Sequence, residues 1–328
     1  MKNDFLIAKG VIFLLANLYL VIPCYNEQEV LIQTAELLQK KISNLIEQKK
    51  ISPESKIVFI DDGSKDKTWN IINDLHSENK IFSGIKLSRN RGHQNALLAG
   101  LMTVKNFCDI TISIDADLQD DIDAIDKMID KYYDGNEIVY GVRSARKTDS
   151  FFKRFTAESF YKLIKFLGSN IIFNHADFRL MSKKALDAFE NFHEVNLFLR
   201  GLVPMIGFKS DIVTYERHER LAGESKYPLK KMLALAWEGI TSLSVKPIKL
   251  ITATGFFIFF VSILMVLYFL FQFINQNTVA GWTTIVISVW MLGGLQLISI
   301  GLIGEYIGKI YLETKHRPKF IIEKFLNE

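Results

Sequence analysis

The stretch ITISIDADLQ, residues 110–119, decides the fold class of this chain. Its first half alternates β-branched and small residues as a strand does, and the carboxylates Asp115 and Asp117 follow directly where that strand ends. We predict this strand over Asp109–Ile114. Further strands of the same character are predicted over Leu18–Ile22, Lys56–Ile60, Gly84–Leu87 and Glu137–Val142. Segments of helical periodicity separate them, which predicts an α/β domain with a mainly parallel sheet covered on both faces.

Polar clusters follow successive predicted strands. They are residues 23–27 (PCYNE), 61–64 (DDGS), 88–92 (SRNRG) and 115–119 (DADLQ). Because ligands collect beyond the carboxyl ends of parallel strands, we expect these clusters to face one pocket. Two carboxylates one residue apart can share a divalent cation, Mg²⁺ or Mn²⁺, with a diphosphate completing the coordination shell. Asp120, Asp121 and Asp123 are expected only to favour the N-terminus of the next helix.

A second region, residues 250–304, contains no Asp, Glu, Lys, Arg or His. A bilayer core needs about 20 apolar residues per helix, so we predict two membrane spans, Leu250–Ile274 and Thr278–Gly304, joined by a tight turn. The residues before them, 228–247, have apolar positions at helical spacing. This pattern indicates an amphipathic helix on the membrane surface, with an ordinary core helix as the alternative.

Charge and cysteine content limit the function classes. Lys and Arg number 40 against 36 Asp and Glu, a net charge of +4, which argues against a nucleic-acid partner. Two cysteines favour a reducing compartment. Basic residues flank both predicted spans and the turn between them has none, so the head and the tail are expected on the cytoplasmic side. These flanking residues are Lys226, Lys230, Lys231, Lys246, Lys249, Lys309, Lys315, Arg317 and Lys319.

The predicted organisation follows from these regions. It comprises an extension over residues 1–16, an α/β domain over 17–227, the juxtamembrane helix over 228–247, the hairpin over 248–308 and a cytoplasmic tail over 309–328. Phe5–Leu20 is largely apolar, which leaves a signal peptide or a third span open. We favour a buried first strand from Asn17 onward, with an extension before it.

The ordered motifs resemble the inverting glycosyltransferases of family two, which have the GT-A fold. The resemblance is strongest to the membrane-anchored polyprenyl-phosphate glycosyltransferases, among them dolichyl-phosphate mannose synthase and bacterial undecaprenyl-phosphate sugar transferases. The motifs that carry it are residues 21–27, 60–64, 89–92 with Ala96 and Ala99-Gly100, 115–119, 177–181 (DFRLM) and 223–227 (GESKY).

The resemblance implies a role for each matching residue. The wall that holds the nucleotide base and ribose would comprise Pro23, Tyr25, Glu27, Ile60 and Asp62. The metal and diphosphate site would comprise Asp115, Ala116, Asp117 and Gln119, with Asp115, Asp117 and Gln119 on the metal. The arginines that reach the donor or acceptor phosphates would be Arg143 and Arg154. The segment that closes over the donor and the lipid phosphate would supply Arg220, Ser225 and Lys226.

Asp177 resembles the candidate catalytic base of the family, and with Asp117 and Arg179 it forms the predicted catalytic set. A phosphate acceptor has a second pKa near 6 and is already mostly dianionic at neutral pH, so a base has little proton to remove. We therefore predict that Asp177 orients the acceptor or Arg179. Base catalysis and a purely structural role, as a helix cap or an ion pair with Arg179, stay open. A substrate contact stays open for His93, His175 and His218, and a solvated loop position is favoured for each.

The predicted reaction is inverting transfer of a sugar, glucose favoured, from a UDP-sugar to undecaprenyl phosphate at the cytoplasmic membrane. The resemblance also suggests a homo-oligomer such as a tetramer, and a separate flippase that moves the product. Alternatives are another donor sugar such as N-acetylglucosamine, a hydroxyl-bearing lipid acceptor, or an inactive membrane scaffold. A processive synthase is disfavoured because its Q-x-x-R-W motif is absent.

Overall fold

The computed structural model describes residues 5–8, 11–144, 175–195, 197–216, 246–274 and 281–327. The chain forms two compact units, each of which is described by itself. The first, the head unit, comprises Met1–Tyr161, Asn170–Pro228 and Pro318–Glu328. The second, the hairpin unit, comprises Lys162–Ser169 and Leu229–Arg317.

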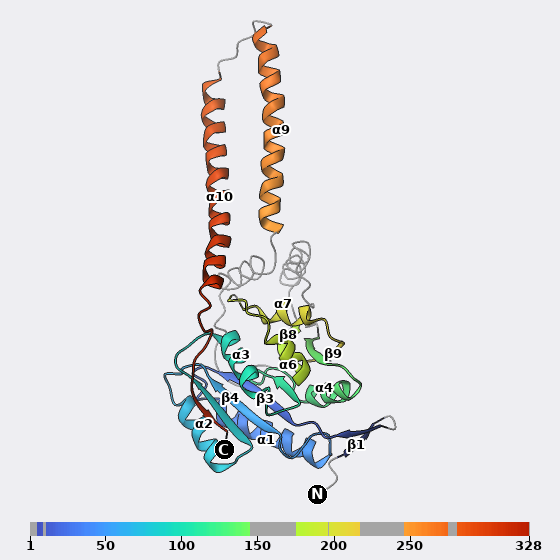
Figure 1. Ribbon diagram of the computed structural model, residues 1–328. Helices are drawn as coiled ribbons and strands as arrows, with labels where there is room; N and C mark the ends of the chain where they lie inside the picture. The colour runs from blue at the N-terminus through green and yellow to red at the C-terminus, as the bar shows by residue number, and fades with distance from the viewer. Residues whose placement is uncertain are drawn as a thin grey trace. The chain divides into compact units, whose positions relative to one another are not determined.

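The head unit is built on an eight-stranded sheet with the order β10-β5-β4-β3-β6-β8-β7-β9 (Figure 1). The strands are β3 (Leu18–Cys24), β4 (Lys56–Asp61), β5 (Phe82–Leu87), β6 (Ile110–Ser113), β7 (Ile138–Arg143), β8 (His175–Ser182), β9 (Ser210–Tyr215) and β10 (Ile322–Leu326). β8 and β10 run antiparallel to their neighbours, and the other strands share one direction. The predicted strands are all present within two residues of their expected ends, and the sheet is mainly parallel as predicted.

Helices cover both faces of the sheet. α1 (Leu31–Glu47), α2 (Thr68–Glu78) and α4 (Ala124–Tyr133) bury their apolar side chains in one core with Leu18, Leu20 and Ile22 of β3. α3 (His93–Val104) covers the other face, where a Cβ on Gly100 would lie 2.7 Å from Val21 and 2.8 Å from Ile60. Every residue of β3 is buried, as expected for a parallel strand covered on both sides.

Three strands of this sheet were not predicted: β8, β9 and β10. β10 lies within the predicted cytoplasmic tail and pairs with β5, so these residues complete one edge of the sheet. The Leu326 side chain is 9% exposed, and the Ser83 hydroxyl donates to the Leu326 carbonyl. The head unit therefore takes part of its core from the C-terminal end of the chain. The shorter helices α6 (Lys183–Phe189), α7 (Leu199–Leu202) and η1 (Val203–Ile206) follow β8.

The predicted N-terminal extension contains a small hairpin before the sheet begins. β1 (Phe5–Ala8) and β2 (Val11–Leu14) pair antiparallel, with Phe5 opposite Leu14. The first strand of the main sheet then starts at Leu18, next to the predicted boundary.

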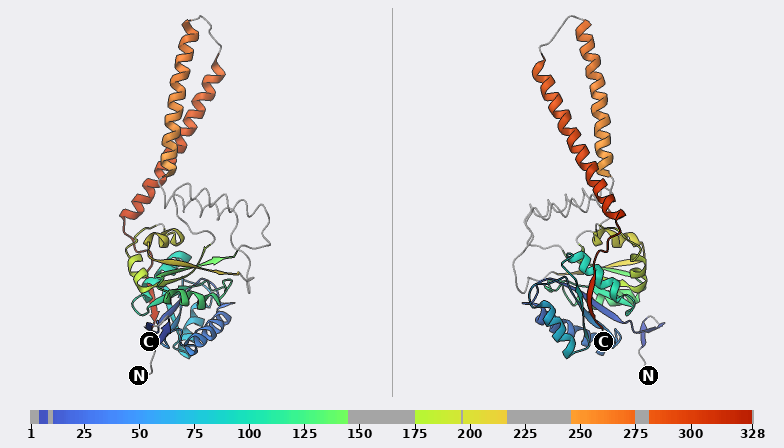
Figure 2. Two further views of the ribbon diagram at one scale, coloured as in Figure 1. Left: turned by 90° about the vertical axis from the view of Figure 1, so that its right-hand side faces the viewer. Right: turned by 60° about the vertical axis from the view of Figure 1, so that its left-hand side comes forward.

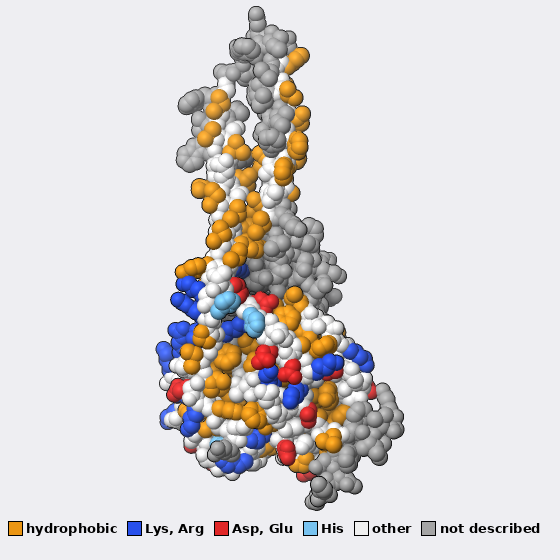
Figure 3. All heavy atoms as spheres, in the orientation of Figure 1, with side chains coloured by type: hydrophobic (Ala, Val, Ile, Leu, Met, Phe, Trp, Pro, Cys, Tyr) orange, Lys and Arg blue, Asp and Glu red, His pale blue; other side chains and the backbone are white. Residues whose placement is uncertain are grey.

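The hairpin unit contains two long antiparallel helices, α9 (Lys246–Ile274) and α10 (Trp282–Thr314), seen from two further sides in Figure 2. α9 contains the first predicted span, whereas α10 extends ten residues beyond the predicted end of the second. In the described part of the chain, one helical segment, Leu292–Thr314 with mean hydropathy 1.2, is long and apolar enough to cross a membrane. Large apolar side chains are exposed along both helices, including Phe257 at 69% and Leu297 at 72% (Figure 3). Such a surface indicates association with lipid.

The predicted amphipathic helix over residues 228–247 lies outside the described residues, except for its last two, which begin α9.

Candidate active site

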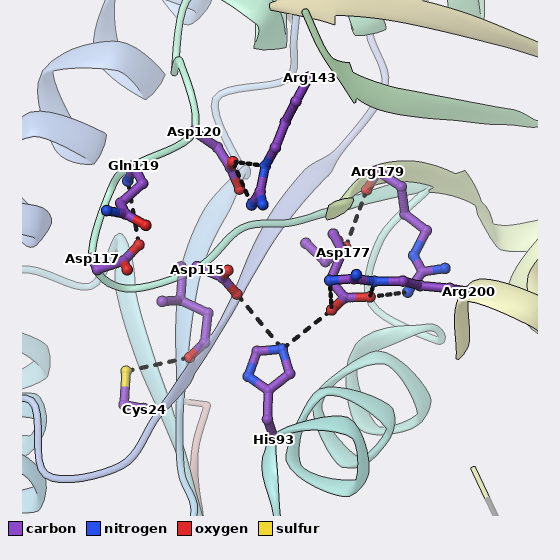
Figure 4. A network of polar contacts seen from close by, with 12 residues as sticks. Cys24, His93, Asp115, Asp117, Gln119, Asp120, Arg143, Asp177, Arg179 and Arg200 are labelled. Atoms are coloured by element: carbon purple, nitrogen blue, oxygen red, sulfur yellow. Dashed lines mark hydrogen bonds and ion pairs between the residues drawn. The ribbon is translucent and has the colours of Figure 1, made fainter. Parts of the chain in front are cut away.

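The candidate site lies inside the sheet, where the end of β6 meets the start of its neighbour β8. Because β8 runs antiparallel to β6, the start of β8 lies beside the end of β6, and Ser113 pairs with Arg179. The Ser113 hydroxyl donates to the carbonyl of Asp177. This pairing brings Asp177 to the same place as Asp115, although 62 residues of sequence separate them (Figure 4).

The turn that carries Asp115 and Asp117 is fixed by helix α1. The buried Thr34 hydroxyl donates to the Ala116 carbonyl at 2.7 Å, and Leu118 adopts the left-handed backbone with φ of 45°. The Asp117 carboxylate accepts from the backbone N–H of Gln119 at 3.3 Å. The Asp115 side chain keeps 37% of its surface exposed, so one carboxylate of the turn faces outward.

The electrostatic surroundings of Asp115 favour the arrival of a cation. Partial removal from water raises the pKa of Asp115, and the nearby charges of Asp120, Asp177 and Asp117 raise it further. The His93 imidazole opposes this increase, with its Nε2 at 3.6 Å from the Asp115 carboxylate. A divalent cation would relieve the repulsion among these carboxylates.

The donor set fits a metal bound jointly by protein and substrate. Among the described residues, no group of three or more His, Cys, Asp or Glu side chains could hold a metal ion. The turn instead offers Asp115 and Asp117, with the Gln119 side chain beside Asp117 (Figure 4). Mg²⁺ is commonly held by one or two carboxylates plus substrate phosphates, and this arrangement matches that pattern.

Asp177 lies at the centre of a dense cluster of cations. Its carboxylate is paired through both oxygens with Arg200, whose Nε and Nη2 donate at 3.3 Å and 3.1 Å. Arg179 donates from Nη2 at 3.4 Å, and His93 Nε2 lies 3.7 Å away. Figure 4 shows the cluster on the side of Asp115 that is opposite Asp117.

These contacts determine the protonation of the cluster. Burial alone would raise the pKa of Asp177, but Arg200, His93 and Arg179 outweigh it and hold the pKa well below its usual range. Burial alone would lower the pKa of His93, but the carboxylates of Asp177 and Asp115 raise it to about 9. Asp177 is therefore an ionised and strongly paired carboxylate at neutral pH, which is a poor arrangement for a general base.

A second cluster of charged and polar side chains, formed by Asp120, Arg143 and Tyr215, lies next to the turn that carries Asp115. The Asp120 carboxylate is 1% exposed and accepts from Arg143 Nη2 at 3.0 Å, from Arg143 Nε at 3.3 Å and from the Tyr215 hydroxyl at 2.6 Å. Arg143 keeps 23% of its side chain exposed. The expectation that Asp120 only favours the next helix is wrong, because its carboxylate is buried and holds Arg143. Asp121 does serve that helix, accepting from the Asp123 N–H at 2.9 Å.

The loops of the predicted nucleotide wall are tied to one another. Asp62 accepts from the backbone N–H groups of Arg91 and Gly92 at 2.7 Å and 2.9 Å, which fixes the start of α3. Asn26 N–H donates to Ser64, and Glu27 N–H donates to Thr68. The Tyr25 side chain is 38% exposed beyond the end of β3 and is available to a ligand. Pro23 is buried in that strand.

The burial of two predicted site residues, Ile60 and Arg179, argues against direct contact of their side chains with a ligand. Ile60 is 0% exposed and packs against α3 at Gly100, so its side chain supports the wall from behind and does not face a ligand. Arg179 was predicted in the catalytic set, but its side chain is 1% exposed and bonds Asp177 and the Leu199 carbonyl. We therefore propose a structural role for the Arg179 side chain. Arg154, Arg220, Ser225 and Lys226 lie outside the described residues.

Sequence reasoning missed Arg200 and gave His93 a contact role only as an alternative. His93 was expected to be a solvated loop residue, yet it begins α3 and lies between Asp115 and Asp177. Its signal was its place immediately after the glycine-containing loop of the third strand. Arg200 is the one charge within the apolar run FLRGLVPMIGF, residues 198–208, and such an isolated charge could have marked it.

Comparison with known proteins identifies the family of this chain. Residues 19–189 match the family described as Glycosyl transferase family 2. The chain belongs to this family. Residues 246–310 match the GtrB C-terminal hairpin, so the glycosyltransferase carries a hairpin of a recognised type, and α9 and most of α10 form it. The fold is accordingly the GT-A-like α/β fold that was predicted.

The glycosyltransferase has relatives over nearly its full length. It is 55% identical over 306 residues to an uncharacterized glycosyltransferase, YkoT, of Bacillus subtilis, covering 93% of this chain and 91% of that protein. It is 41% identical over 306 residues to a bactoprenol glucosyl transferase of Shigella phage SfV, covering 93% and 97%. Among solved structures it resembles glucosyl-3-phosphoglycerate synthase of Mycobacterium tuberculosis, with 16% identity, a TM-score of 0.45 and coverage of 70% and 78%. That last likeness is too weak to carry an argument.

Proposed function

We propose that this glycosyltransferase transfers a sugar, with glucose favoured, from a UDP-sugar to undecaprenyl phosphate. The observation that carries the proposal is the arrangement of charged side chains where β6 ends and β8 begins. An outward carboxylate at Asp115 lies near two arginines that are ion-paired with other carboxylates, Arg143 with Asp120 and Arg200 with Asp177 (Figure 4). Such a site suits two phosphate-bearing substrates together with a divalent cation. The relatives named bactoprenol glucosyl transferases support glucose and a polyprenyl carrier.

In this reaction the acceptor phosphate attacks the anomeric carbon in line, UDP leaves and the configuration inverts. A Mg²⁺ or Mn²⁺ ion held by Asp115, Asp117 and Gln119 would neutralise charge on the departing diphosphate. Arg143, fixed by Asp120, would reach a substrate phosphate. Tyr25 and Glu27 would line the nucleotide site. Catalysis would come chiefly from positioning and from charge stabilisation by groups already in place.

The pairing of Asp177 disfavours a hydroxyl acceptor. Attack by a lipid hydroxyl needs a base that removes its proton, whereas Arg200, His93 and Arg179 hold the pKa of Asp177 well below its usual range and make it a weak base. A phosphate monoester is mostly dianionic at neutral pH and needs no such base. The arrangement therefore favours the phosphate acceptor over the hydroxyl-bearing lipid.

The hairpin supports a membrane location for the reaction. We infer that α9 and α10 both cross the cytoplasmic membrane, with the head on the cytoplasmic side where basic residues flank the apolar segments. An anchored head can meet a lipid phosphate at the headgroup level. Homo-oligomers, a tetramer among them, and a separate flippase for the product complete the proposal.

Transfer of radiolabelled sugar from a panel of UDP-sugars to undecaprenyl phosphate tests the function directly. The purified full chain in detergent is incubated with Mn²⁺ or Mg²⁺, and lipid products are extracted and separated. We expect a labelled lipid that mild acid releases, strongest with UDP-glucose, and the opposite anomeric configuration to the donor by NMR. Absence of product with every donor, from a protein that is folded and binds UDP, would reject the proposal.

A further inference from the structure

One carboxylate near the site is surrounded by more positive charge than it can balance. Asp177 contacts Arg200 at 3.1 Å, Arg179 at 3.4 Å and His93 at 3.7 Å. Arg200 and Arg179 are both charged at neutral pH, so the arginines in contact with Asp177 carry more charge than its one carboxylate. The cluster thus keeps an excess of positive charge beside the site, which is the complement of an anionic ligand.

Within this cluster the cations differ in access. Arg179 is 1% exposed and is closed off from ligands, whereas the Arg200 side chain is 35% exposed. Asp177 occupies the Nε and Nη2 edge of the Arg200 guanidinium. Among the described residues no partner is seen for Nη1, and a guanidinium held by one edge presents its remaining donors in a fixed fork suited to phosphate.

The backbone around Arg200 is also held in place. The Leu199 N–H donates to the Gln94 side chain at 3.0 Å, and the Leu199 carbonyl accepts from Arg179 Nη1 at 3.3 Å. Helix α7 is thereby attached both to α3 and to β8 immediately before Arg200. A cation on such a support loses little conformational freedom when it binds an anion.

The position of Arg200 favours the acceptor phosphate over the donor diphosphate. Asp117 and Gln119 lie on one side of Asp115, and Asp177 with Arg200 lies on the other (Figure 4). An in-line displacement requires the attacking and leaving phosphates on opposite sides of the sugar. With the diphosphate and its metal at the Asp117 side, the Arg200 side is left for the attacking group.

We propose that Arg200 binds the phosphate of the lipid acceptor and that Asp177 is a positioning residue that holds Arg200 for this task. The assignment of an acceptor rests on the proposed function, but phosphate binding by Arg200 does not require sugar transfer. Asp177 acts here through Arg200 and takes no proton from the substrate.

Binding of farnesyl phosphate to the full chain in detergent tests the first part. Arg200→Ala is expected to weaken binding roughly tenfold or more, since a charge-assisted contact is lost, while Arg200→Lys retains part of it. Farnesol, which lacks the phosphate, and inorganic phosphate, which lacks the lipid, separate the contributions of the two halves of the probe. Lys184→Ala, which removes an exposed cation on α6, serves as the matched control. Equal binding of farnesyl phosphate by wild type and Arg200→Ala would overturn the proposal.

Steady-state kinetics separate this proposal from the proposed function. We expect Arg200→Ala to raise KM for undecaprenyl phosphate roughly tenfold or more and to leave KM for the UDP-sugar within about twofold. A comparable rise in the donor KM would place Arg200 on the donor and reject the assignment. If the wild type transfers no sugar yet Arg200→Ala still loses farnesyl phosphate binding, the proposed function fails and this inference stands.

A double-mutant cycle tests the role of Asp177. If Asp177 acts through Arg200, Asp177→Asn raises the acceptor KM in the wild type and has little further effect in the Arg200→Ala protein. A general base would instead lower kcat in both backgrounds, and that result would overturn the positioning role. UDP binding and thermal unfolding of each variant identify any protein that has simply lost its fold, and in that case Asp177→Glu replaces Asp177→Asn in the cycle.

Discussion

Asp115 and Asp177 lie together where β6 ends and β8 begins. The charges around Asp115 are mainly negative, whereas those around Asp177 are mainly positive. Asp115 is 37% exposed, burial and neighbouring acids raise its pKa, and in the described part of the chain its ion pair is with His93. Asp177 is 10% exposed and its cations lower its pKa. The difference teaches that carboxylates in one site can divide the work. We propose that Asp115 gains a cation from outside, whereas Asp177 is already paired with cations of the protein and orients them.

Loss of either carboxylate in the turn after β6, Asp115 or Asp117, is expected to have the largest effect on turnover. Asp115→Ala and Asp117→Ala should each reduce turnover by about a thousandfold, because the diphosphate would lose the charge that stabilises its departure. Mn²⁺ binding, measured by electron paramagnetic resonance on the full chain with UDP, should weaken in parallel.

The control for these variants lies in the same region of sequence. Asp123 is 81% exposed and pairs with Lys41, so Asp123→Asn should retain turnover and Mn²⁺ binding. Normal Mn²⁺ binding by Asp115→Ala would show that Asp115 is not a metal ligand. The contrast drawn here between Asp115 and Asp177 would then be wrong.

A change to the buried ion pair of Asp120 with Arg143 is expected to have an intermediate effect on turnover. Asp120→Asn leaves Arg143 without its buried counter-charge and should reduce turnover by roughly tenfold to a hundredfold. Removing one partner of a buried pair also costs about 3 kcal/mol, so the free energy of unfolding of the head should fall by that order in denaturant titrations.

Tyr215→Phe gives a graded variant for the same group. It removes the hydroxyl that donates to Asp120 and accepts from Arg143 Nε, and it retains the ring, whose centroid lies 5.3 Å from that of Phe178. We expect a smaller loss than in Asp120→Asn for both turnover and unfolding. Equal losses in the two variants would mean that the hydroxyl, and not the Asp120 charge, positions Arg143.

The sequence predicted the parts of the molecule that depend on local pattern. The strands from Leu18 to Arg143 are apolar segments with polar clusters at their ends, and both features can be read in order along the chain. The hairpin follows from a long segment without charge. Asp115 and Asp117 were predicted at a strand end, and the structure has them there.

The features that were missed depend on contacts between distant segments. β10 is a short strand whose partner β5 precedes it by more than 200 residues, and its Leu326 is buried only through that pairing. Asp177 lies near Asp115 because β8 runs antiparallel to β6. The residues of β8 themselves do not indicate in which direction the strand runs. Asp120 resembled its exposed neighbours in sequence, and the fold alone buries it against Tyr215.

The smallest expected effect is a difference in pH dependence between the two carboxylates. Because the pKa of Asp115 is raised, protons compete for it as the pH falls from 7 toward 5, and Mn²⁺ affinity should decrease by at most about tenfold per pH unit. Because the pKa of Asp177 is lowered, its contribution to stability is fully present above the pKa of an unfolded Asp, near 3.9, and is lost only as the pH falls further through the folded value. Calorimetric Mn²⁺ titrations and thermal unfolding over the same pH series check both halves. A melting temperature that fell together with Mn²⁺ affinity between pH 7 and pH 5, in the wild type and in Asp123→Asn alike, would show that the two carboxylates titrate as one group.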